Sequence, residues 1–101
     1  MYERMHAFAA VVEQKSLNKA ALVLNISQPA LSRKINSLEA ELGVQLFYRK
    51  GKKLELTRIG QISYEFALQM RDLQQRFLQT LADYKRKGKI TVTIGASLTT
   101  L

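Results

Sequence analysis

The chain contains no cysteine and a single histidine among its 101 residues. The absence of cysteine excludes disulfide bonds and thiolate metal sites, and it permits a reducing compartment. The one histidine, His6, has no cluster of carboxylates beside it, and neither a glycine-rich phosphate loop nor a metal-ligand spacing occurs. We therefore expect no enzyme activity, no metal and no cofactor, and we expect His6 to lie at the surface of its helix.

Long apolar runs are equally absent. The longest, from Ala7 to Val12, is too short to cross a bilayer. No signal peptide is evident, because a charged n-region and a small-residue cleavage site are missing. The sequence thus predicts a cytoplasmic protein that does not span a membrane.

Acidic residues are scarce, since 8 Asp and Glu face 16 Lys and Arg and leave a net charge of +8. This balance favours a polyanionic partner, either nucleic acid or an anionic membrane surface. The excess is uneven, because basic residues fill four of the five positions in 49–53 and again in 85–89. Basic proteins also bind anions non-specifically, so the charge alone does not identify the partner.

Apolar spacing predicts two helices in the first 25 residues. The first covers residues 3–14, where apolar side chains recur at i, i+3, i+4 and i+7 from Met5. The second follows Ser16, a good N-cap, and ends at Asn25, which readily adopts a left-handed C-cap conformation. The inner face of this second helix consists of Leu17, Ala20, Ala21 and Leu24.

A third helix follows after a short turn. Ser27 caps it, Pro29 stands in its first turn, where a missing N–H is tolerated, and Gly43 ends it. Two short helices joined in this way form a helix-turn-helix, here at about residues 17–42.

The third helix has two different faces. One is an apolar stripe of Leu31, Ile35, Leu38 and Leu42. The opposite face holds Pro29, Ser32, Arg33 and Asn36. This outer face carries no carboxylate until Glu39, whereas a merely solvated face usually carries Glu and Lys. Small polar groups and one guanidinium suit a groove of base edges and phosphates, where Gln28 can pair with adenine and Arg33 with guanine or a phosphate.

A basic hairpin is predicted next. Strand-like runs at 46–49 and 54–57 flank the loop Lys50-Gly51-Lys52-Lys53. Such a tip can serve solubility alone, but after a helix-turn-helix it resembles a wing that contacts phosphates or the minor groove. Thr57 can cap the element that follows.

From about residue 58 to 87 the sequence predicts one long helix, with Gly88 as its C-cap. Its apolar stripe repeats every eleven residues and consists of Ile62, Phe66, Met70, Leu73, Phe77, Leu81 and Tyr84. The first turns could be covered by the chain's own domain, but too little chain remains to cover the rest, so we expect a dimer interface. A membrane-surface helix is the rival interpretation, although the polar face is rich in Gln rather than Lys.

The residues beyond 88 alternate like a strand at 90–94 but have no sheet to join. We interpret the chain as a fragment that ends just inside a second domain.

These patterns together resemble the LysR-type transcriptional regulators. The matching residues are Phe8, SLNKAA at 16–21, SQPALSR at 27–33, LEAELGVQLFYR at 38–49 and LELTRIG at 54–60, in order and without insertion. Leu17 departs from the phenylalanine common in the family, a buried change that should leave DNA contact intact.

The resemblance implies a mainly α fold, with a winged helix-turn-helix of three helices and a β-hairpin, followed by a long dimerisation helix. The expected domains are residues 1–58 for DNA binding, 59–88 for the linker helix and 89–101 for the start of an effector-binding domain. The expected partners are double-stranded DNA with a pseudo-palindromic operator and a second copy of the chain, with a tetramer left open for the full-length protein. A small-molecule effector would bind only the missing domain.

The expected DNA-binding residues, matched to the family by position, are Ser27, Gln28, Pro29, Ser32, Arg33, Lys34, Asn36, Arg49, Lys50, Lys52 and Lys53. The alternative function is a winged-helix protein-interaction module without sequence-specific DNA binding.

Overall fold

A computed structural model describes residues 1–48 and 54–88 of the chain. Predictions for the hairpin loop and for residues 89–101 fall outside this part. The chain divides into two compact units, Met1–Met70 and Arg71–Leu101. The first unit holds the three short helices, the hairpin strands and the beginning of the long helix.

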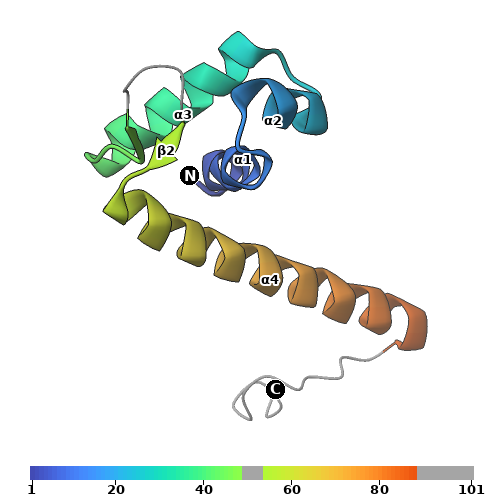
Figure 1. The fold of residues 1–101 in the computed structure, drawn as a ribbon. Helices are drawn as coiled ribbons and strands as arrows, with labels where there is room; N and C mark the ends of the chain where they lie inside the picture. The colour runs from blue at the N-terminus through green and yellow to red at the C-terminus, as the bar shows by residue number, and fades with distance from the viewer. Residues whose placement is uncertain (49–53, 89–101) are drawn as a thin grey trace. The chain divides into compact units, whose positions relative to one another are not determined.

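Three helices form the core of the first unit, in which α1 (Tyr2–Gln14) packs against both α2 (Leu17–Leu24) and α3 (Gln28–Leu42) (Figure 1). The largest fully buried side chains are Phe8, Leu31, Leu38, Leu46 and Val11. Phe8 of α1 meets Phe47 edge to face, with ring centroids 5.4 Å apart. Such a pair contributes about 0.5–1.5 kcal/mol beyond the burial of its area. The predicted helices of the helix-turn-helix are confirmed.

The caps that separate these helices are those expected from the sequence. The hydroxyl of Ser16 accepts a hydrogen bond from the backbone N–H of Lys19 at 3.2 Å, and that of Ser27 accepts one from Ala30 at 3.2 Å. Asn25 ends α2 in the left-handed region at φ 59°, and Gly43 ends α3 at φ 73°. Helices α2 and α3 therefore each begin with a serine that accepts a hydrogen bond from a backbone N–H of the first turn. Each also ends with a residue that tolerates the left-handed conformation.

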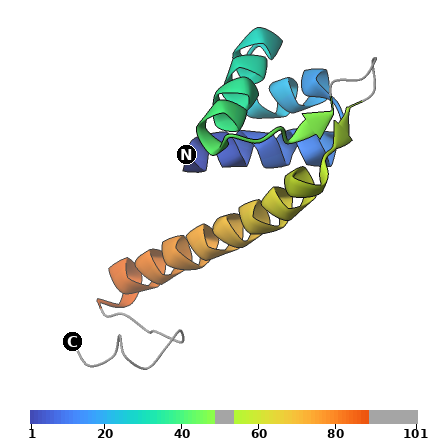
Figure 2. The ribbon, with the colours of Figure 1, turned by 90° about the vertical axis from the view of Figure 1, so that its left-hand side faces the viewer.

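The described hairpin strands lie within the two predicted runs. Strands β1 (Phe47–Tyr48) and β2 (Glu55–Leu56) pair antiparallel, with Phe47 opposite Leu56 and Tyr48 opposite Glu55 (Figure 2). Phe47 is buried and Tyr48 exposed, as the alternation of a half-buried strand requires. The base of a wing is thus present.

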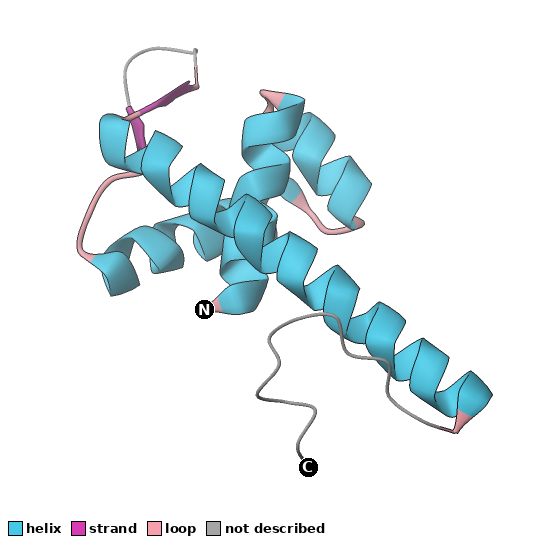
Figure 3. Ribbon diagram, turned by 90° about the horizontal axis from the view of Figure 1, so that it is seen from below, coloured by secondary structure: helices cyan, strands magenta, loops and turns pink. Residues whose placement is uncertain are grey.

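The long helix α4 (Arg58–Lys87) begins and ends where the sequence predicts (Figure 3). The Thr57 hydroxyl accepts from the Gly60 N–H at 2.9 Å and donates to the Gln45 carbonyl at 2.6 Å. Gly88 closes the helix at φ 75°, with its N–H on the carbonyl of Tyr84.

The first turns of α4 lie against the core mainly through residues outside the predicted stripe. Gly60 and Ala67 are the buried residues of this helix, and Tyr64 and Met70 are half-buried beside the core. A side chain at Gly60 would meet the carbonyl oxygen of Leu46 at 2.2 Å. Small residues here let two backbones approach closely.

The predicted stripe itself is largely exposed, including its first turns. Phe66 is 55% exposed and Phe77 59%, and Ile62, Leu73 and Tyr84 are exposed as well. In the first turns of the stripe, Met70 is half-buried beside the core, whereas Ile62 and Phe66 are exposed, so the chain's own domain covers only part of the stripe there. In the part of the chain that the structure describes, no helix is both long enough and apolar enough to cross a membrane.

Candidate nucleic-acid interface

The outer face of α3 presents the polar residues that the sequence singled out. Ser27, Gln28, Pro29, Arg33 and Asn36 are exposed, and Ser32 and Lys34 are half-buried. Ser27 caps the N–H of Ala30 and Pro29 has no N–H, so the N–H of Gln28 is the donor in the first turn that stays available to an acceptor outside the helix. Arg33 makes no ion pair within residues 1–48 and 54–88. A cation and a free backbone donor thus share one helix face.

Two residues of α3 differ from the sequence-based expectation. Leu42, predicted in the inner stripe, is 36% exposed, because the last turn of the helix extends past the buried side chains of the core. Glu39, predicted to end the outer face, is buried. Its carboxylate accepts hydrogen bonds from the backbone N–H groups of Leu46 at 2.7 Å and Phe47 at 3.3 Å. Glu39 therefore holds the start of β1, and the exposed outer face lacks that carboxylate.

Ion pairs join the first turn of α1 to α3. The Lys34 ammonium lies 2.5 Å from a carboxylate oxygen of Glu3, and this hydrogen bond and charge lower the pKa of Glu3 below its usual range. Since the folded-state pKa is depressed, the pair is complete above the usual pKa of a glutamate and is lost as the pH falls through the lowered value. Arg4 also reaches α3, where it bonds to Ser37 and Glu41. Lys34 is thus engaged within the protein, unlike Arg33.

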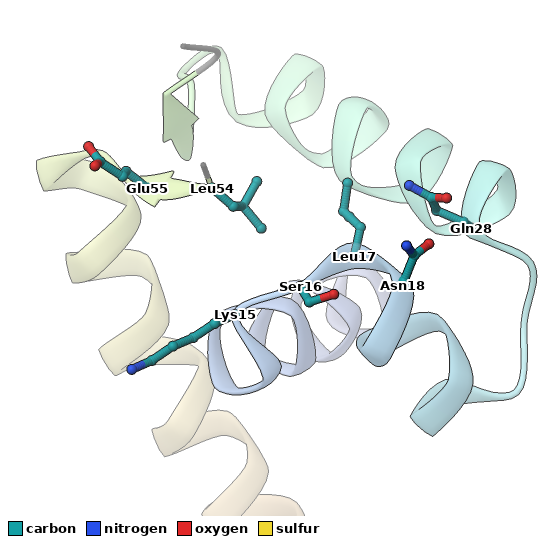
Figure 4. A pocket seen from close by; sticks show the side chains of 7 residues that line it. All are labelled: Lys15, Ser16, Leu17, Asn18, Gln28, Leu54 and Glu55. Carbon is teal, nitrogen blue, oxygen red and sulfur yellow. The ribbon is translucent and has the colours of Figure 1, made fainter. Parts of the chain in front are cut away.

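An open cleft with a volume of about 490 Å³ borders the beginning of α3. Gln28 and Asn18 face it from α3 and α2, and Leu54 reaches into it from just before β2 (Figure 4). The charged ends of Lys15 and Glu55 point away from it. Neutral polar groups from the helix-turn-helix and an apolar side chain from the wing base therefore border one concave surface.

Leu17 also lines this cleft and is half-buried. The sequence-based view that it is a buried residue is therefore too strong. His6 is exposed, as expected.

The basic residues of the wing cannot be placed. Arg49, Lys50, Lys52 and Lys53 lie outside the described residues. Their contact with phosphate stays a prediction from the sequence.

Sequence reasoning missed Glu3, Arg4 and Glu39. Glu3 and Arg4 lie more than thirty residues from their partners, and no local pattern marks such a pair. The partners of Glu39 are backbone amides, which leave no trace in the sequence.

A family model described as the bacterial regulatory helix-turn-helix protein, lysR family, matches residues 2–61. The chain belongs to the LysR family. A YbhD protein of Escherichia coli K12, an uncharacterized HTH-type transcriptional regulator, is 43% identical over 93 residues, which are 87% of this chain and 28% of that protein. A probable RuBisCO transcriptional regulator of Emiliania huxleyi is 36% identical over 98 residues, covering 97% of this chain. The LysR-family chain thus spans about a third of the length of such relatives, 31% in the last case.

Solved structures of LysR regulators share this fold. A complex of the BenM DBD with catB site 1 DNA matches with a TM-score of 0.80 and 34% identity, over 84% of this chain and 94% of that one. DarR of Vibrio fischeri in complex with DNA matches with a TM-score of 0.79 and 28% identity, over 88% of this chain and 30% of that one. The mainly helical fold with a winged helix-turn-helix and a long helix is therefore confirmed.

Proposed function

We propose that this LysR-family chain binds double-stranded DNA as part of a sequence-specific transcription regulator. The observation that carries the proposal is the exposed polar face of α3, where Gln28 and Arg33 lie on a helix whose start is capped by Ser27. A helix of this kind enters the major groove with its first turns at the base edges. Both solved structures described above that contain DNA belong to relatives of the same fold.

The roles of the individual residues follow from their chemistry. Arg33 suits guanine O6 and N7, and Gln28 suits adenine N6 and N7. The free N–H at the start of α3 suits a phosphate. The residues proposed to contact DNA are Ser27, Gln28, Pro29, Ser32, Arg33 and Asn36 on the recognition helix, and Arg49, Lys50, Lys52 and Lys53 on the wing. Lys34, the remaining candidate from the sequence, is paired with Glu3.

Dimerisation through α4 completes the proposal. One recognition helix reads only a few base pairs, whereas two helices in successive major grooves read a pseudo-palindrome. The proposed interface is the exposed apolar stripe of Ile62, Phe66, Met70, Leu73, Phe77, Leu81 and Tyr84. The full-length protein would act in the cytoplasm, and its effector would bind outside residues 1–88.

Selection of bound sequences from a random duplex pool tests the function directly, because it yields an operator if there is one. With that operator, Arg33→Ala should cost about 1–3 kcal/mol of binding free energy, with a smaller loss on random DNA. Arg76→Ala on α4 is the matched control, since it removes the same charge from a helix not proposed to touch bases.

If Arg33→Ala lost equal binding free energy on operator and random DNA, Arg33 would contact a phosphate and not a base. Enrichment of no sequence, together with no gel shift at low salt, would contradict the function. That result would favour the alternative of a protein-interaction module whose basic charge serves solubility.

A further inference from the structure

The first turn of α1 is fixed along one side of the recognition helix. Arg4 donates a hydrogen bond to the hydroxyl of Ser37 at 3.2 Å and forms an ion pair with Glu41. The side chains of Arg4 and Glu41 are 31% and 42% exposed, so these contacts lie at the surface, where they join the first turn of α1 to α3. The register of α1 against α3 is thereby set, and Glu3 stands one residue earlier on the same turn.

Glu3 meets one of the two cations of α3. Its carboxylate lies 2.5 Å from the Lys34 ammonium, and Glu3, Arg33 and Lys34 line the same open cleft between the two helices. Glu3 itself is 80% exposed, so the pair lies at the protein surface beside the outer face of α3. Lys34 is therefore neutralised locally, whereas Arg33 keeps its charge for an outside partner.

We infer that Glu3 is a specificity-determining residue, which withholds Lys34 from DNA phosphates and so limits the sequence-independent attraction of the recognition helix. The inference rests on the proposed DNA-binding function. A lysine on a phosphate adds affinity on every sequence, whereas an arginine on a base edge adds it on one. Because base contacts fix the register of α3 on the operator, pairing the lysine lowers random binding more than operator binding, and it raises their ratio without any contact between Glu3 and a base.

The size of the effect follows from counterion release. Each phosphate contact changes the slope of log affinity against log salt by about 0.9. Freeing Lys34 should therefore steepen the slope by about one unit and tighten random binding several-fold at low salt. On the operator the gain should be smaller, because base contacts hold α3 in one register, whereas on random DNA the protein can settle where Lys34 reaches a phosphate.

The test is a salt titration of binding to random and selected duplexes with four proteins: the unaltered chain, Glu3→Gln, Lys34→Gln and the double variant. Glu3→Gln should steepen the slope on random DNA by about one unit and lower the ratio of operator to random affinity. Lys34→Gln should weaken binding to all sequences, because it leaves the carboxylate of Glu3 unpaired beside α3. It should not flatten the slope by a unit, because Lys34 is already paired. The double variant should return to the slope of the unaltered chain.

Glu65→Gln is the matched control, since it removes one exposed negative charge from α4 and reports the general effect of net charge. All variants should keep the melting temperature within a few degrees, because an exposed ion pair contributes little to stability.

A slope for Glu3→Gln equal to that of Glu65→Gln would overturn the inference. So would a loss of one unit of slope in Lys34→Gln with Glu3 present, since Lys34 would then contact phosphate despite its partner. Failure of the unaltered chain to bind any duplex would instead overturn the proposed function itself, and the two failures are therefore distinguishable.

Discussion

Helices α3 and α4 are both amphipathic, yet the apolar stripe of α3 is mostly buried and that of α4 is mostly exposed. On α3, Leu31 and Leu38 are fully buried at 0% exposure. On α4, Phe66 and Phe77 keep more than half of their surface, at 55% and 59%. An apolar stripe at helical spacing predicts that something covers it, but the spacing does not say whether that is the same chain or another one.

The buried side of α4 sharpens this difference. It is made of Gly60 and Ala67, which contribute little apolar area but permit a close backbone approach. Of the large side chains of the same helix, Tyr64 and Met70 are half-buried beside the core, whereas Phe66, Leu73 and Phe77 are exposed. In α4, then, the closest contact within the chain depends on a small residue, and the proposed contact between chains depends mainly on large exposed ones.

The largest effect on folding is expected from the buried stripe of α3. Leu38→Ala should destabilise the first unit by about 2–5 kcal/mol, because it removes a fully buried side chain and leaves a cavity. Chemical denaturation followed by circular dichroism measures this loss.

Leu42→Ala, on the same stripe but 36% exposed, is the matched control and should cost clearly less. Equal costs at both positions would mean that burial does not distinguish them, and the difference drawn between α3 and α4 would fail with it.

A smaller loss is expected at the close contact of α4. Gly60→Ala places a methyl group 2.2 Å from the backbone carbonyl oxygen of Leu46, so the helix or the segment before β1 must shift. Overpacking of this kind costs about 1–3 kcal/mol, although alanine alone favours a helix. Denaturation again gives the measurement, and a stabilised variant would show that α4 does not approach Leu46 so closely.

The smallest effect on folding is expected from a change in the exposed stripe. The same change should have the largest effect on the oligomeric state in solution. Phe77→Asp should leave the unfolding of the first unit within about 0.5 kcal/mol, as is usual for surface positions, while it disrupts an apolar interface between copies. Sedimentation equilibrium should therefore show monomers.

Gln75→Asp adds the same charge on the opposite side of α4 and should remain a dimer. A dimer that survives Phe77→Asp would remove this stripe as the interface.

The sequence was sufficient for the helices because their ends carry local chemistry. Ser16, Ser27 and Thr57 cap by bonding to an N–H three residues on, and Asn25 and Gly43 adopt the left-handed region. The strands were less predictable, because two residue pairs form the described ladder and its extent depends on the rest of the wing.

The candidate site was predictable where it depends on one helix and not where it depends on several. The exposed face of α3 follows from its periodicity, and Gln28 and Arg33 follow from residue type. The pairing of Lys34 with Glu3 and the burial of Glu39 arise from packing between distant segments, which a periodic pattern does not encode.

In mechanical terms, residues 45–47 are a shared attachment. Glu39 of α3 holds the amides of Leu46 and Phe47, while Thr57, at the start of α4, donates to Gln45 through its hydroxyl and to Leu46 through its N–H. Glu39 and Thr57 therefore bind the same three residues of backbone. A rotation of the first turn of α4 would be transmitted through these hydrogen bonds to β1 and to the part of α3 that holds Glu39.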